Sequence, residues 1–91
     1  MELKLNCRNI PQVVQLTVKQ LSKTPPKVRI IVQDWDKQNT KYTDRWNTIK
    51  GTETFHIRLP MSPKIARINI ISMNKAPFKL IKKSKAPYKH R

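Results

Sequence analysis

Apolar and polar residues alternate with a period of two along most of this chain, which is the pattern of strands that bury one face. In the clearest stretch, Phe55, Ile57 and Leu59 occupy one face and His56 and Arg58 the other. The same alternation predicts further strands over residues 2–7, 28–33 and 66–70, a less regular one over 42–49, and a short edge strand at Leu80 and Ile81.

Residues 11–22 fit two periodicities. Val14, Leu16 and Val18 would share one face of a strand, whereas Val14, Val18 and Leu21 would form one stripe of a helix. The flanking residues include an N-cap type, a proline allowed in a first helical turn, and a Thr-Pro-Pro stop: Asn9, Pro11 and 24–26. These signals favour one short helix over residues 11–22.

The turns that join these elements must form almost without glycine, because Gly51 is the only one. Polar residues and prolines in 36–40 and 60–63 are the expected substitutes. Strands separated by such turns, with one helix, predict a mainly β fold: a small antiparallel β-sandwich. A single curled sheet closed by the helix is the competing architecture.

Composition adds that this domain is small and strongly basic. Its 91 residues allow one domain, and 20 Lys and Arg against five Asp and Glu give a net charge of +15. The apolar fraction of 37% predicts a thin core, and self-repulsion opposes compaction. We therefore expect a domain that an oppositely charged partner stabilises.

The basic charge is concentrated near the C-terminus. Residues 75–91 carry seven basic groups and no acid, whereas residues 1–74 carry 13 basic and five acidic groups. A Lys-Ala-Pro-aromatic-Lys unit occurs twice, at 75–79 and 85–89. Because proline disfavours helix, we predict a folded β-rich body over residues 1–74 and an extended basic arm over residues 75–91.

The sequence contains few residues that could form a catalytic site or a metal site. The single cysteine, Cys7, would need His56 or His90 beside it to form a nucleophile, and one glycine excludes a phosphate-binding loop. Oxygen ligands for a cation occur at Asp34, Asp36, Asn39 and Asp44, but local pairing with Lys37, Lys41 or Arg45 is favoured. We expect no enzymatic activity, no cofactor and no metal site.

The basic residues themselves are the candidate binding residues. Those of the predicted arm, with its two aromatics, are Lys75, Phe78, Lys79, Lys82, Lys83, Lys85, Tyr88, Lys89 and Arg91. Those of the predicted strands are Arg29, Arg45, Arg58 and Arg67. Such a set suits either an acidic protein surface or nucleic acid, where lysines would contact phosphates and aromatics would stack on bases.

Three runs within residues 27–63 resemble a known group: residues 27–36, 42–51 and 55–63. They resemble a small β-rich module of virion-associated proteins in tailed bacteriophages, notably crAss-like phages. The resemblance involves no catalytic motif, and no catalytic residue is carried over from it. It implies a structural or interaction role within a particle.

We therefore expect a non-enzymatic structural component of a phage-like virion, such as a minor capsid, decoration or neck or tail protein. It would be present in multiple copies, would assemble in the host cytoplasm, and would dock on a larger acidic protein. A nucleic-acid-binding protein is the main alternative, and a small inhibitor of an acidic enzyme is a third. We expect no membrane partner, because the longest aliphatic run is Ile30 to Val32.

Overall fold

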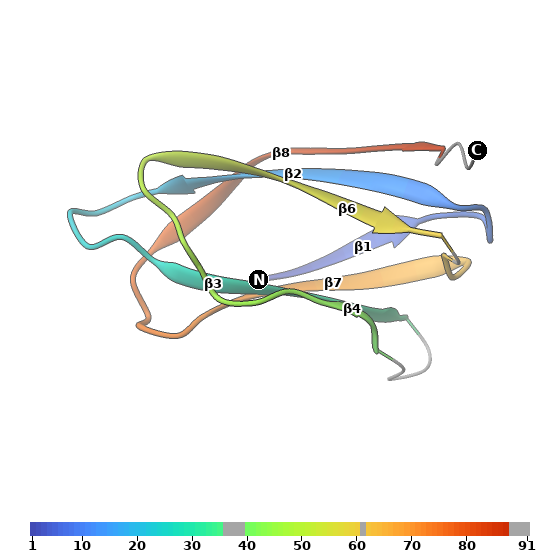
Figure 1. The fold of residues 1–91 in the computed structure, drawn as a ribbon, viewed down its shortest axis with the longest axis horizontal. Helices are drawn as coiled ribbons and strands as arrows, with labels where there is room; N and C mark the ends of the chain where they lie inside the picture. The colour runs from blue at the N-terminus through green and yellow to red at the C-terminus, as the bar shows by residue number, and fades with distance from the viewer. Residues whose placement is uncertain (36–39, 61, 88–91) are drawn as a thin grey trace.

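The computed structural model describes residues 1–35, 40–60 and 62–87, and its strands form two antiparallel sheets (Figure 1). The first sheet has the order β1-β7-β3-β4, with β5 also pairing with β3, and the second has the order β6-β2-β8. The strands are β1 (Glu2–Asn6), β2 (Gln12–Gln20), β3 (Lys27–Asp34), β4 (Thr40–Thr43), β5 (Asn47–Thr48), β6 (Thr52–Leu59), β7 (Ile65–Ser72) and β8 (Phe78–Pro87). The predicted antiparallel β-sandwich is thus confirmed.

The core lies between the facing sides of the two sheets. The second sheet contributes Val14, Leu16 and Val18 from its central strand β2, and each of these side chains is fully buried. The first sheet contributes alternate residues of β3 and β7, such as Ile30 and Ile68, which are also fully buried. One layer of branched aliphatic side chains therefore stabilises both sheets, as the alternation predicts.

The chain passes from one sheet to the other at every connection except β3–β4 and β4–β5. Several of these connections contain residues with a left-handed backbone: φ is 56° at Arg8, 59° at Asn9, 73° at Gly51 and 58° at Lys75. At Gly51 the backbone N–H donates to Gln20 Oε1 at 2.7 Å and the carbonyl accepts from the Gln20 N–H at 2.7 Å. This pair of bonds fastens the start of β6 to the end of β2.

The predicted helix over residues 11–22 is wrong, because residues 12–20 form the strand β2. Leu16, which the helical stripe left out, is fully buried, whereas Leu21, which that stripe included, is 52% exposed. Asn9 is no helix cap but a left-handed residue of the β1–β2 turn. Pairing with β6 on one side and β8 on the other provides β2 with a partner along both edges.

Residues 78–87, which the sequence assigns to the basic arm, form the strand β8 within the sandwich. β8 pairs with β2 from Gln20↔Phe78 to Gln12↔Pro87. Phe78 and Leu80 are half-buried against the core, and Ala76 is buried just before the strand. The structure thus places this segment inside the fold and the expected boundary at 74/75 in the β7–β8 connection.

The less regular strand predicted over residues 42–49 is two short ones, β4 and β5. Between them Asp44 accepts hydrogen bonds from the Arg45 N–H at 2.8 Å and from Asn47 Nδ2 at 2.7 Å. These bonds form a local turn that interrupts the pairing with β3. Of the two predicted turns, residues 36–39 and Met61 lie outside the described residues.

Candidate binding site at the edge of the second sheet

Four lysines lie on β8, an edge strand that pairs with β2 on one side only among the described strands. They are Lys79, Lys82, Lys83 and Lys85, and all four are exposed. We call them the β8 lysines. All four belong to the larger set of binding residues that the sequence predicts for residues 75–91.

The register of β8 against β2 directs these lysines to both faces of the sheet. Lys79 lies opposite Lys19 on the outer face, and Lys83 lies opposite Leu16 on the face toward the core. A bulge at Ile81 shifts the register, so that Thr17 pairs with Lys82 and Val18 with Leu80. The β8 lysines therefore present charge above, below and along the open edge.

Lys85 reaches across the sandwich from the second sheet to the first. It lies opposite Val14 in the register, and its Nζ donates a hydrogen bond to the backbone carbonyl of Asn6, at the end of β1. At this point a lysine, rather than an apolar side chain, connects β8 of the second sheet to β1 of the first. Charge on the inward side of an edge strand opposes pairing with another copy of the same strand.

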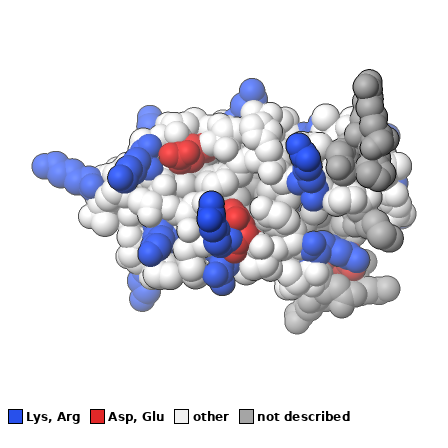
Figure 2. Space-filling view, viewed as in Figure 1, with Lys and Arg blue, Asp and Glu red and all other residues white. Residues whose placement is uncertain are grey.

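No acidic side chain pairs with a β8 lysine in the described part of the chain. The ion pairs found there join Lys41 to Asp34 at 3.9 Å and Arg67 to Glu2 at 4.0 Å. Lys19 and Lys79 are direct cross-strand neighbours, and like charges in that position are destabilising. Figure 2 shows basic side chains spread over one view of the molecule with few acidic groups between them.

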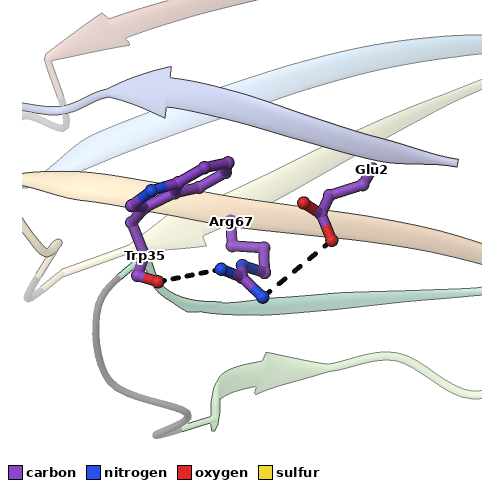
Figure 3. Close-up of polar contacts among 3 residues, drawn as sticks. All are labelled: Glu2, Trp35 and Arg67. Atoms are coloured by element: carbon purple, nitrogen blue, oxygen red, sulfur yellow. Dashed lines mark hydrogen bonds and ion pairs between the residues drawn. The ribbon is translucent and has the colours of Figure 1, made fainter.

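Two of the predicted phosphate-binding arginines are held by tryptophans on the outer face of the first sheet. The Arg67 guanidinium lies 4.7 Å from the ring centre of Trp35 and donates to the Trp35 carbonyl at 3.0 Å, with Glu2 on its other side (Figure 3). Arg29 stacks on Trp46 in the same way, at 4.5 Å. These guanidiniums stabilise the sheet surface by cation–π contact and are less free to bind a phosphate.

The Arg67 cluster contains two residues that sequence reasoning missed. Lys4 lies opposite Arg67 in the β1–β7 register, and its Nζ is 5.1 Å from the ring centre of Trp35. Glu2 completes the cluster from the start of the same strand. Alternation alone put Lys4 and Arg67 on outer faces, but only the pairing of β1 with β7 brings them together.

The remaining predicted binding residues are dispersed. Arg45 and Arg58 are exposed on the β4–β5 connection and on β6, and Lys75 is exposed in the β7–β8 turn. Phe78 packs against the core instead of projecting as a stacking platform. Tyr88, Lys89, Arg91 and His90 lie outside the described residues.

The structure separates the candidate nucleophile from His56, one of its two candidate bases. Cys7 is fully buried between the sheets, whereas His56 lies on the outer face of β6, opposite Gln15. Burial raises the pKa of the Cys7 thiol, and the nearby Lys85 ammonium opposes that rise only in part. A buried neutral thiol is a poor nucleophile.

The raised pKa of Cys7 predicts a stability that falls at alkaline pH. The folded state keeps the thiol proton that the unfolded chain loses near pH 9.0, so the contribution is complete below that pH and is lost as the pH rises through the folded pKa. Denaturant unfolding between about pH 8 and about pH 9.5 should give a steeper fall in the free energy of unfolding for the native chain than for Cys7→Ala. Equal slopes would show that the thiol does not ionise on unfolding.

Oxygen ligands for a cation do not gather in the described residues. Asp34 pairs with Lys41, and Asp44 accepts bonds from its own turn, while Asp36 and Asn39 lie outside the described part of the chain. In that part, no three His, Cys, Asp or Glu side chains are grouped as metal ligands would be. Nor does any helix in it have the length and apolar character of a membrane span.

Comparison with known proteins identified no relative of this chain. No protein-family model, no curated protein and no solved structure matches the chain.

Proposed function

We propose that this protein is a non-enzymatic structural component of a phage-like virion, and that it docks on an acidic neighbouring protein through β8. The observation that carries the proposal is the set of β8 lysines: four exposed cations on one open strand, with no acidic partner among the described residues. An acidic surface laid along this edge would neutralise them.

The energetics of the isolated domain favour the same conclusion. Lys19 and Lys79 face one another across β2 and β8 in a like-charge pair, and the whole chain carries +15. Neither feature helps the sandwich to fold, because self-repulsion opposes the compact state. Binding of an anionic partner would replace the repulsion of the Lys19–Lys79 pair, and that of the whole basic chain, with attraction.

A protein partner fits this edge better than nucleic acid does. Base stacking needs exposed aromatic faces, whereas Phe78 and Tyr42 pack against the core and the two tryptophans stack on arginines. Arg29 and Arg67 are engaged in those stacks. Among the described residues, what β8 itself presents is a row of lysines, which suits carboxylates.

The virion setting rests on the resemblance of residues 27–63 to the phage module. Those residues span β3 to β6, so they lie in the body of the sandwich and leave β8 outside the resemblance. The β-rich body would then be the part shared with the phage module, and β8 the part that selects the neighbour. Multiple copies in one particle would follow from such a role.

Neutralising the β8 lysines tests the docking site. The variant carries Lys→Gln at positions 79, 82, 83 and 85, and the matched control carries Lys→Gln at the exposed positions 23, 27, 50 and 64. Both lower the net charge equally. At about 0.2–1 kcal/mol for each exposed ion pair, we expect the β8 variant to bind polyglutamate about thirtyfold more weakly than the native chain.

The control variant should lose much less affinity, because its lysines are scattered. Equal losses in the two variants would show that net charge alone attracts the polymer and would contradict a site at β8. A parallel titration with duplex DNA at low salt decides the alternative. DNA binding that is tighter than polyglutamate binding and needs the β8 lysines would favour the nucleic-acid function instead.

A further inference from the structure

β8 offers backbone hydrogen-bonding groups as well as charge. In an antiparallel pair, alternate residues of each strand direct their N–H and C=O groups away from the partner strand. β8 is the longest strand described, and among the described strands it pairs only with β2, so that its other side is an open edge there. Such an edge can accept one more strand.

The usable part of this edge lies between two interruptions. The bulge at Ile81 disturbs the ladder at its start, and Pro87 lacks an N–H at its end. Residues 82–86 lie between them in continuous register with β2, from Thr17↔Lys82 to Val13↔Ala86. An added strand would therefore pair with this short segment.

Charge decides which strand can occupy that edge. A second copy of β8 would place lysine against lysine, which is destabilising. An acidic strand would instead place carboxylates beside Lys82 on the outer face and beside Lys83 and Lys85 on the other. The same lysines thus exclude a second copy and favour an acidic strand.

We infer that an extended acidic segment of the partner protein adds to the second sheet as a fourth strand, paired with residues 82–86 of β8. The inference rests on the proposed function, because it specifies how the acidic neighbour is bound. Backbone pairing would supply the affinity and the lysines the specificity. Acidic residues at successive positions of the segment would reach both faces of the sheet, since side chains alternate along a strand.

The test compares two synthetic peptides of identical sequence, each short and rich in glutamate and threonine. One has a normal backbone, and the other is N-methylated at every residue, so that its charge is unchanged but both of its pairing edges are blocked. With the full-length protein we expect the normal peptide to bind about tenfold or more tightly than the methylated one. Hydrogen exchange of the amides within residues 82–86 should slow only in the complex with the normal peptide.

The outcomes separate this inference from the proposed function. If both peptides bind equally and both need the β8 lysines, the acidic partner is held by side chains alone and strand addition is refuted, while docking at β8 stands. If neither peptide nor polyglutamate binds, the proposed function fails with it. Slowed exchange at β6 or β1 instead of β8 would refute the chosen edge.

Discussion

Replacing Leu16 with alanine is expected to lower the free energy of unfolding by about 2–5 kcal/mol, whereas Leu21→Ala should change it by less than about 0.5 kcal/mol. Leu16 is fully buried at the centre of β2, and Leu21 is 52% exposed beyond its end. A domain of this size has a total stability of about 5–14 kcal/mol, so the first substitution removes a large share of it. Urea unfolding of the two variants measures both effects.

The pair also tests the secondary structure of residues 11–22. On the helical stripe, Leu21 would be buried with Val14 and Val18, and Leu16 would lie off that stripe. A large loss for Leu21→Ala together with a small one for Leu16→Ala would therefore contradict the strand β2. Since both substitutions remove the same atoms, the difference between them reports burial alone.

Ending the chain after Asn74 should abolish cooperative folding. This truncation removes β8, and with it the buried Ala76, the half-buried Phe78 and Leu80, and one of the two partners of β2. The half-buried Phe78 and Leu80 and the buried Ala76 contribute about 1 kcal/mol each. Loss of the whole β2–β8 ladder, which exposes the core side of β2, adds to this, and together they approach the stability of the whole domain. Thermal unfolding followed by circular dichroism should show no cooperative transition.

The Lys→Gln variant at positions 79, 82, 83 and 85 is the control for this truncation, because it keeps β8 and removes only its charge. It should unfold cooperatively, with a stability within about 1 kcal/mol of the native chain, since removal of the Lys19–Lys79 repulsion offsets loss of the Lys85–Asn6 hydrogen bond. A truncated chain as stable as the full one would show that residues 75–91 are a detachable arm. It would also show that β2 needs no partner at this edge.

Local alternation predicted most of the sandwich, but it failed over residues 11–22, where the same residues fit both the period of a strand and the period of a helix. Val14 and Val18 fit both a strand and a helix, and the flanking signals, which were Asn9 as a cap, Pro11 and the stop at 24–26, favoured the helix. Asn9 instead adopts a left-handed turn, which asparagine does more readily than most residues. The strand conformation of residues 12–20 depends on pairing with β6 and β8, which are far away in the sequence.

Pairing between strands that are distant in the sequence also explains two other differences. Residues 78–87 were assigned to an arm, and the cluster of Glu2, Lys4, Trp35 and Arg67 was not predicted. A strand at the edge of a sheet tolerates charge on both faces, so alternation predicted only the short part of β8 at Leu80 and Ile81 and missed its lysine-rich remainder. Lys4 and Arg67 meet only because β1 pairs with β7. The β8 lysines were predictable from the sequence because basic residues are dense in this part of the chain, and that density can be recognised without knowledge of the fold.

The most direct test of a docking site at β8 is a titration of the isotopically labelled protein with polyglutamate, followed residue by residue in amide NMR spectra. We expect the largest shifts on residues 79–86 and on their β2 neighbours, and no change on the outer face of the first sheet, with Trp35 and Trp46. Shifts spread evenly over the basic surface, or centred on the first sheet, would contradict it.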